Sequence, residues 1–251
     1  EKTVSALEGA VDTVACTSGM AAISLMMELF DSGSHFVCTE DLYGGSVRIF
    51  EALEKKRGFS FSYINTADVE AVEKAITDQT KALYIETPSN PTMQVTDLAE
   101  MSRLATKHGL LLIVDNTFAT PINCRPFEWG ADIVTHSTTK YMDGHAMTVG
   151  GCIVDSGNFD WEAHHDKFTG LTEPDESYHG IIYTQKFGKL AYITKATSQL
   201  MRDLGSIQSP QNAFLINVGL ETLHLRMPKH CENALKVATY LKSREDFAWV
   251  N

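Results

Sequence analysis

Residues 131–145 read ADIVTHSTTKYMDGH, which joins a strand-like run to a single lysine, Lys140, among small hydroxyl residues. The five residues 131–135 are mostly apolar and β-forming, which is typical of a buried strand. A solvated turn is one explanation of the Ser-Thr-Thr-Lys that follows, because most lysines are exposed. The other is a lysine held at a strand end for covalent chemistry, so the residues around the neighbouring strands become informative.

Apolar runs alternate with helical segments throughout the first two thirds of the chain. We expect seven strands, at residues 13–17, 35–39, 59–64, 81–85, 110–114, 131–135 and 151–154. We expect helices at 20–30, 46–57, 68–76 and 97–108, with Asp68 and either Thr96 or Asp97 as N-caps and Gly109 as a terminator. This alternation predicts an α/β fold with a mostly parallel seven-stranded sheet and helices on both faces.

The last third of the chain has a different character. Residues 157–183 show no clear period, and their Gly, Pro, Asp, His and aromatic residues predict a long surface loop or lid. Helices are expected at 185–204 and 211–226. Pro228 is expected to restart the helix, so that 229–243 forms an amphipathic helix. Its apolar face would carry Cys231, Leu235, Ala238 and Leu241.

Composition excludes several classes of protein. The 251 residues are 43% hydrophobic, and no apolar run approaches the ~20 residues of a membrane span. The first residues lack the pattern of a signal peptide. A net charge of −11 with one short basic cluster, at 55–57, disfavours nucleic-acid binding. The five cysteines are widely spaced and odd in number, which argues against disulfides or a zinc site and favours buried thiols in a cytoplasmic protein.

Polar residues follow the expected strands, at the edge where open α/β sheets bind ligands. Ser18, Gly19 and Met20 open a helix after the first strand, and free helix N–H groups suit a phosphate. An ordinary strand-to-helix turn is the alternative. Tyr43, beside two glycines after the second strand, is either a core aromatic or a platform that a flat ligand can approach.

An acid and the lysine complete this set of residues. Asp115 follows five apolar residues, where a carboxyl can cap a loop, bind a metal or pair with a buried cation; no further ligands at metal spacing accompany it, so we expect no metal. A desolvated Lys140 would be nucleophilic toward carbonyls, and Ser137 and Thr139 can hold phosphate oxygens. Pyridoxal 5′-phosphate (PLP) needs a lysine, an acid, a stacking ring and a phosphate site together.

Several motifs then resemble the cysteine/methionine-metabolism family of PLP enzymes, which includes cystathionine γ-synthase, the γ-lyases and the O-acylhomoserine sulfhydrylases. The motifs are SGM (18–20), DLYGG (41–45), ETPSNP (86–91), VDNTFATP (114–121) and HSTTKYMDGH (136–145). The resemblance implies a PLP fold-type I (aspartate aminotransferase-like) domain. Residues 1–226 would form the PLP-binding large domain, and 227–251 would begin a C-terminal domain.

The resemblance also implies a role for each site residue. Lys140 looks like the Schiff-base lysine, Asp115 like the partner of the pyridine nitrogen, and Tyr43 like the stacking ring with a role in proton transfer. The other residues expected to contact the cofactor are Ser18, Gly19, Met20, Asn90, Thr117, Ser137 and Thr139. Among these, Gly19 and Met20 would offer N–H groups and Ser137 and Thr139 hydroxyls to the phosphate, while Asn90 would lie near the 3′-oxygen and the substrate carboxylate.

Within the family, the segment FTGLTEPDESYHG (168–180) and Gly45 look most like O-acetylhomoserine sulfhydrylases. That subgroup implies γ-replacement on O-acetyl-L-homoserine by sulfide or methanethiol, in methionine biosynthesis and transsulfuration. Methionine γ-lyase, cystathionine γ-synthase and a cofactor-binding fragment without turnover remain alternatives. The expected partners are the small amino-acid substrate and a sulfide or thiol, with no nucleic acid and no membrane.

Two parts of the family pattern are not found in this sequence. They are an upstream Tyr-x-Arg pair that reaches the neighbouring subunit's phosphate site, and a C-terminal arginine that binds the substrate carboxylate. We therefore expect a truncated chain that is poorly soluble or inactive by itself. The resemblance implies a homotetramer built from dimers whose subunits share each active site.

Overall fold

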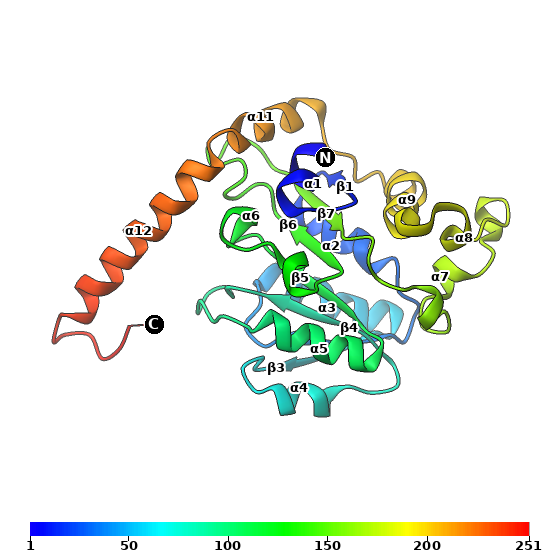
Figure 1. Cartoon of the computed structure of the whole chain (residues 1–251), viewed down its shortest axis with the longest axis horizontal. Helices are drawn as coiled ribbons and strands as arrows, with labels where there is room; N and C mark the ends of the chain where they lie inside the picture. Colours follow the sequence, from blue (N-terminus) through cyan, green and yellow to red (C-terminus); the bar gives the residue numbers. More distant parts are fainter. Residues whose placement is uncertain (251) are drawn as a thin grey trace.

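The seven apolar runs of the sequence form one sheet in a computed structural model of the protein, which describes residues 1–250 (Figure 1). The strands are β1 (Asp12–Cys16), β2 (His35–Thr39), β3 (Ser60–Ile64), β4 (Thr80–Glu86), β5 (Leu111–Asp115), β6 (Ile133–His136) and β7 (Gly151–Asp155). Their order is β1-β7-β6-β5-β4-β2-β3, and only β7 runs antiparallel to its neighbours. The predicted α/β class and mostly parallel sheet are confirmed.

Helices follow most strands and begin and end where the local sequence favours it. They are α1 (Lys2–Glu8), α2 (Gly19–Met27), α3 (Gly44–Arg57), α4 (Val69–Ala75), α5 (Leu98–His108) and the short α6 (Thr120–Asn123). The Asp97 carboxylate caps α5 by accepting hydrogen bonds from two backbone N–H groups, and Gly109 ends it with a φ of 61°. Asp68 caps α4 in the same way.

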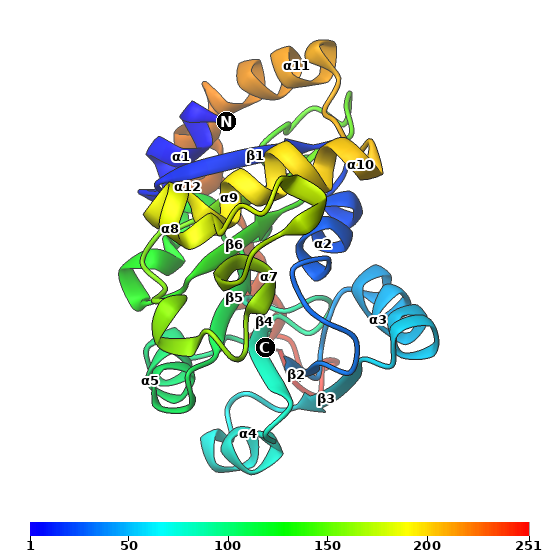
Figure 2. The same ribbon diagram turned by 90° about the vertical axis from the view of Figure 1, so that its right-hand side faces the viewer.

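Apolar side chains cover the sheet on both faces. On one face Phe36 and Ile113 pack with α2, α3 and the later helix α9 (Ala191–Lys195), which Figure 2 shows beside β1. On the other face Leu112 and Val114 pack with α1, α4 and α5. The helices cover both faces of the sheet, so polar side chains gather at its edge, at the carboxyl ends of the parallel strands.

The prediction of a surface loop at 157–183 is wrong for the apolar part of that segment. It contains short helices, η2 (Glu162–His164), α7 (Thr169–Thr172) and η3 (Glu176–Tyr178), and Phe168 and Leu171 are buried in the core. The Lys195 ammonium fastens the segment by donating 2.8 Å hydrogen bonds to the Gly170 carbonyl and to Asp175. Because none of these residues lines the large cavity described below, the segment is not a lid over it.

Helices fill the rest of the chain. The predicted helix at 185–204 is a run of short pieces, namely α8 (Tyr183–Phe187), η4 (Gly188–Leu190), α9, the π-helical η5 (Ala196–Met201) and α10 (Arg202–Leu204). The last two helices are α11 (Pro210–Leu220) and α12 (Leu223–Lys242). Pro228 lies inside α12 rather than restarting the helix, although a proline at this sixth helical position removes one backbone N–H and crowds the carbonyl four residues earlier.

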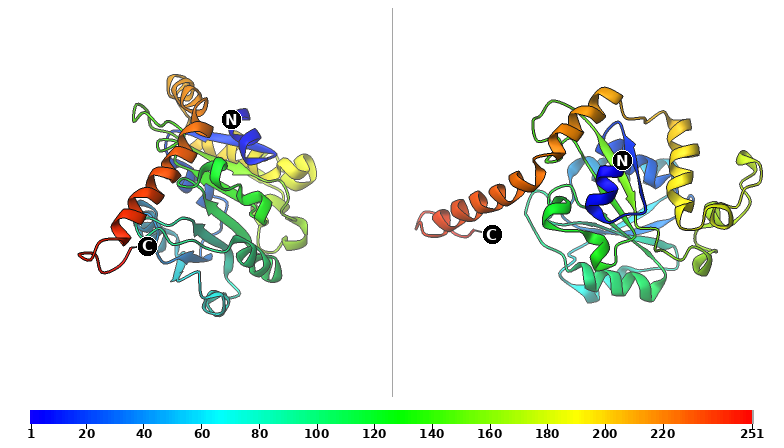
Figure 3. Two further views of the ribbon diagram at one scale, coloured as in Figure 1. Left: turned by 60° about the vertical axis from the view of Figure 1, so that its left-hand side comes forward. Right: turned by 45° about the horizontal axis from the view of Figure 1, so that its top comes forward.

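The end of α12 projects from the body of the molecule (Figures 1 and 3). Cys231 and Leu235 are exposed there, whereas Ala238 and Leu241 are half-buried, so the predicted amphipathic face is only partly covered within residues 1–250. None of the helices formed by these residues has both the length and the apolar character that a membrane span requires. Cys16, Cys38 and Cys152 are buried free thiols, as expected.

Candidate active site

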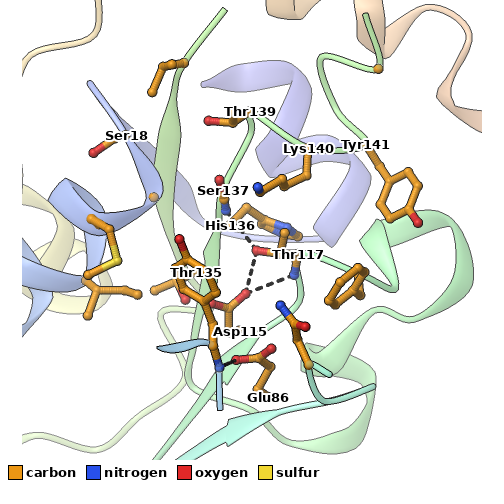
Figure 4. Close-up of a pocket in the computed structure, with 18 of the residues that line it drawn as sticks. Ser18, Glu86, Asp115, Thr117, Thr135, His136, Ser137, Thr139, Lys140 and Tyr141 are labelled. Atoms are coloured by element: carbon orange, nitrogen blue, oxygen red, sulfur yellow. Dashed lines mark hydrogen bonds between the residues drawn. The ribbon is translucent and has the colours of Figure 1, made fainter. Parts of the chain in front are cut away.

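A cavity of about 650 Å³ opens at the carboxyl ends of β4, β5 and β6 beside the start of α2 (Figure 4). All ten candidate residues from the sequence line it: Ser18, Gly19, Met20, Tyr43, Asn90, Asp115, Thr117, Ser137, Thr139 and Lys140. The structure therefore brings together residues that lie far apart in the chain. No cluster of metal-ligating side chains is found among residues 1–250.

The amino end of α2 forms one wall of the cavity. The Ser18 hydroxyl caps the helix by accepting a 3.0 Å hydrogen bond from the Ala21 N–H. Gly19 packs directly on Ser137, since a Cβ on Gly19 would lie 2.7 Å from the Ser137 Cβ. This close contact sets the first backbone N–H groups of α2 beside the Ser137 hydroxyl, and both are donors suited to an anion.

Asp115 ends β5 at the floor of the cavity. One carboxylate oxygen accepts hydrogen bonds from the Thr117 hydroxyl at 2.5 Å and from the Thr117 N–H at 3.1 Å, and the Thr117 hydroxyl oxygen accepts one from the Ser137 N–H at 2.9 Å (Figure 4). Burial raises the pKa of the Asp115 carboxyl, although the Thr117 hydrogen bonds oppose the rise. No salt bridge to Asp115 forms within residues 1–250.

Glu86 is a second acid in the cavity, a buried one that the sequence analysis did not select. It pairs with Asp115 in the register of β4 and β5, and its Oε2 accepts a 2.9 Å hydrogen bond from the Tyr43 N–H. Burial and the charge of Asp115 together raise the pKa of Glu86 to about 8. Its position directly after the apolar end of a strand is the same signal that identified Asp115.

Tyr43 lies at the edge of the cavity with 45% of its surface exposed. A Cβ on Gly45 would lie 2.3 Å from the Tyr43 ring, so Gly45 makes room for that ring. The expectation that these glycines admit a flat ligand directly therefore needs correction. Gly45 allows the tyrosine to fold over the start of α3, which leaves the ring accessible at the cavity edge.

Lys140 follows a tightly held turn. The Thr139 hydroxyl donates to the Gly150 carbonyl at 3.0 Å and accepts from the Gly150 N–H at 3.1 Å, while the Lys140 N–H donates to the Ser137 carbonyl at 3.2 Å. The Lys140 side chain lines the cavity but is exposed, so the desolvation expected of it is absent from this chain by itself.

The rim of the cavity carries Arg226 and His230, two residues of α12 that the sequence analysis did not place there. The Arg226 guanidinium donates to the carbonyls of Tyr141 at 2.7 Å and Gly219 at 2.8 Å. The His230 ring meets the Tyr141 ring edge-on at 5.2 Å. No local pattern connects these residues, because they lie more than 80 positions after the lysine turn.

These side chains fit PLP. A half-buried carboxyl without a salt-bridge partner among residues 1–250 suits the protonated ring nitrogen, and the lysine suits the aldehyde. The helix N-terminus beside Ser137 suits the phosphate. An α/β sheet that brings these groups to one cavity defines a PLP-binding enzyme domain.

The chain belongs to the Cys/Met metabolism PLP-dependent enzyme family, whose model matches residues 1–251. It is 42% identical over 253 residues to homocysteine/cysteine synthase of Saccharomyces cerevisiae, covering 100% of this chain and 57% of that protein. It is 41% identical over 260 residues to O-acetyl-L-homoserine sulfhydrylase of Leptospira meyeri, covering 100% of this chain and 58% of that protein. The chain thus spans less than two thirds of these relatives.

A solved structure with the same fold is that of a putative O-acetylhomoserine (thiol)-lyase from Campylobacter jejuni. It superposes with a TM-score of 0.91 at 34% sequence identity, covering 98% of this chain and 61% of that one. That structure contains an N′-pyridoxyl-lysine-5′-monophosphate. The predicted fold-type I architecture and the PLP dependence of the family are therefore confirmed.

Proposed function

We propose that this protein catalyses γ-replacement on O-acetyl-L-homoserine, in which sulfide or methanethiol displaces acetate and yields homocysteine or methionine. The observation that carries the proposal is the meeting of Lys140, Asp115 and the start of α2 at one cavity. Relatives named homocysteine/cysteine synthase and O-acetyl-L-homoserine sulfhydrylase support the choice of reaction.

The catalytic roles follow from the chemistry of each group. PLP, when bound, supplies an electron-withdrawing ring that stabilises negative charge at the substrate carbon next to the amine. Asp115 holds a proton on the ring nitrogen. Lys140 would bind the aldehyde carbon of PLP, and its amine would hold and move protons at the substrate Cα and Cβ. Tyr43 covers the ring and assists proton transfer at the leaving acetate.

The phosphate site follows from the donors beside α2. The N–H groups of Gly19 and Met20 and the hydroxyls of Ser137 and Thr139 bind phosphate oxygens. Thr139 must turn its hydroxyl hydrogen away from the Gly150 carbonyl to do so, because a phosphate oxygen accepts hydrogen bonds. Three further residues complete the contacts, with Ser18 and Thr117 beside the cofactor and Asn90 near its 3′-oxygen and the substrate carboxylate.

The proposal extends to the organisation of the protein. Residues 1–226 act as the PLP-binding large domain and 227–251 begin a C-terminal domain, with α12 continuous across that boundary. The enzyme works in the cytoplasm, in methionine biosynthesis and transsulfuration, as a homotetramer of dimers whose subunits share active sites. Its partners are the amino-acid substrate and a sulfide or thiol.

Borohydride reduction tests the central assignment. The protein is incubated with PLP, reduced and weighed by mass spectrometry. Wild type is expected to gain one pyridoxyl group on the peptide that contains Lys140, because reduction fixes the lysine-bound cofactor. Lys140→Ala is expected to lose this adduct, whereas Lys186→Ala, altered on a distant helix, keeps it. The same adduct on Lys140→Ala would refute the assignment.

Product analysis tests the reaction. Homocysteine from O-acetylhomoserine and sulfide is the expected product. Release of α-ketobutyrate from methionine would identify a γ-lyase instead. Formation of cystathionine from cysteine and O-acetylhomoserine would identify a cystathionine γ-synthase. A preparation that binds PLP but turns over none of these substrates would indicate a cofactor-binding chain without catalysis.

A further inference from the structure

A buried acid that the proposed mechanism does not use lies next to the cofactor residues. Glu8, the last residue of α1, is only 1% exposed. Its Oε1 accepts hydrogen bonds from His136 Nε2 at 2.5 Å and from Asn116 Nδ2 at 3.0 Å. His136 and Asn116 are equally buried, at 1% and 0% exposed. We call these three residues the Glu8 cluster.

The partners of Glu8 alternate along the chain with residues of the cavity. Asn116 lies between Asp115 and Thr117, and His136 directly precedes Ser137. Asn116 does not line the cavity, whereas Asp115, Thr117 and Ser137 do, as Figure 4 shows. His136 reaches Glu8 with its Nε2 and also forms part of the cavity wall. Each partner of Glu8 is therefore adjacent in sequence to a residue that PLP needs.

Further hydrogen bonds connect the Glu8 cluster to the backbone at the ends of β5 and β6. The Asn116 N–H donates to the Thr135 carbonyl at 3.0 Å, and its Nδ2 also donates to the Cys124 carbonyl at 2.9 Å. On the cavity side, the Ser137 N–H donates to the Thr117 hydroxyl at 2.9 Å. The Glu8 Oε1 on α1 thus links the ends of β5 and β6 through its hydrogen bonds to Asn116 and His136.

The Glu8 cluster holds the strands together at a high cost in desolvation free energy. Burying a carboxylate is costly, and well-packed apolar side chains would stabilise the fold as well or better. The other oxygen, Oε2, has no hydrogen-bond partner among residues 1–250. What hydrogen bonds add over apolar packing is a fixed direction, because they hold Asn116 and His136 in one orientation.

We propose that Glu8 is a positioning residue of the cofactor site. Through His136 and Asn116 it holds the ends of β5 and β6 at the spacing that lets Asp115 and Ser137 engage PLP together. This inference deepens the proposed function and rests on it. Glu8 itself does not line the cavity, so it acts only through its two partners.

PLP affinity tests the inference apart from turnover. PLP is titrated into the PLP-free protein, and binding is followed by the absorbance of the bound cofactor. Glu8→Ala is expected to weaken binding by about tenfold or more and to shift the absorption band, since supporting hydrogen bonds orient ligating groups. Glu8→Gln keeps an acceptor oxygen at the same place and is expected to stay within about threefold of wild type.

Val72→Ala is the matched control. Val72 is fully buried on α4, does not line the cavity, and its truncation lowers the stability of the PLP-free protein without touching the Glu8 cluster. It is expected to keep wild-type PLP affinity. If Glu8→Ala does not fold, Asn116→Leu takes its place under the same criteria, because it removes the Nδ2 donor at a residue that does not line the cavity and fills similar space.

The outcomes separate this inference from the proposed function. Failure of wild type to bind PLP at all would overturn the proposed function. Wild-type affinity and spectrum in Glu8→Ala would overturn the positioning role alone. An equal loss of PLP affinity in Val72→Ala would show that the Glu8→Ala effect comes from lower stability of the whole protein and would overturn the positioning role. An equal loss in Glu8→Gln would show that the charge of Glu8, and not the position of its acceptor oxygen, matters for PLP binding.

Discussion

At the scale of single residues, the site is defined by two acids in different environments, Glu86, which is buried, and Asp115, which is half-buried. Asp115 accepts two hydrogen bonds from Thr117, whereas Glu86 accepts one from the Tyr43 N–H and faces the charge of Asp115. Burial raises the pKa of both carboxyls, and that of Glu86 reaches about 8. Burial and the charge of Asp115 thus favour the protonated form of Glu86 near neutral pH.

We expect the stability of the PLP-free protein to depend on pH through Glu86. Its pKa is raised from 4.5 to about 8 by burial and by Asp115, so the folded state binds a proton that the unfolded chain has released. The contribution is full below the unfolded pKa of 4.5 and is lost as the pH rises through about 8. Glu86→Gln is expected to reduce the change in urea-unfolding free energy over this window by roughly 4–5 kcal/mol.

The control for this experiment is Glu70→Gln, because Glu70 is an exposed acid on α4. It should leave the pH profile as in wild type. Part of the slope should remain in Glu86→Gln, since burial also raises the pKa of Asp132 and Asp155 to about 7. An unchanged slope in Glu86→Gln would show that Glu86 is ionised in the folded protein.

At the scale of elements, α12 holds the turn that carries the lysine. Arg226 donates to the Tyr141 carbonyl, one residue after Lys140, and to the Gly219 carbonyl at the end of α11. Its guanidinium also packs against Gly144, where a Cβ would lie 2.6 Å away. The planar fork of an arginine can reach both carbonyls at once, which the single ammonium of a lysine does less well.

Removing this tether should loosen the lysine turn. Arg226→Met is expected to lower the free energy of unfolding by about 2 kcal/mol, because two carbonyls in part-buried hydrogen bonds lose a charged donor. Amide hydrogen exchange at 140–147 should rise, and PLP affinity should fall. Arg244→Met serves as control, since among residues 1–250 Arg244 bonds only Asp246 and Tyr240, near the exposed end of α12. Unchanged exchange in Arg226→Met would contradict the tether.

The elements themselves were predictable because their signals are local. Each strand is a short apolar run, and α5 carries its own cap and stop at Asp97 and Gly109. All ten site candidates line one cavity because they follow strand ends, whose convergence is a property of parallel sheets. The aromatics of 157–183 gave no such signal, since side chains that pack into a core from short irregular turns need no period.

Glu8 and Arg226 were not predictable for a different reason. Glu8 meets His136 across 128 positions and Arg226 meets Tyr141 across 85. Neither residue stands in a pattern that distinguishes it from an exposed charge on a helix. Only the folded arrangement shows that one lies behind the cofactor residues and the other beside the lysine turn. The roles of charged residues whose partners lie far away in the chain therefore could not be predicted from the sequence.

At the scale of the whole molecule, much of α12 lacks packing contacts with the rest of the described chain. It leaves the body after its first turns (Figure 3), and Leu225, Leu235 and Val237 are 64%, 70% and 57% exposed. Exposed apolar area of this kind is covered in most soluble proteins, because burying it releases about 25 cal/mol per Å². These side chains face more than one side of the helix, so a single amphipathic contact cannot cover them all.

We expect this chain to self-associate through α12 as its concentration rises, because association is the available way to bury that surface. Sedimentation velocity should show a species that grows with protein concentration and that the double change Leu235→Glu, Val237→Lys makes smaller. PLP affinity should be unchanged, since neither residue lines the cavity. Leu204→Glu, at an exposed leucine on α10, is the control and should sediment as wild type. A double variant that associates as strongly as wild type would place the contact elsewhere on the molecule.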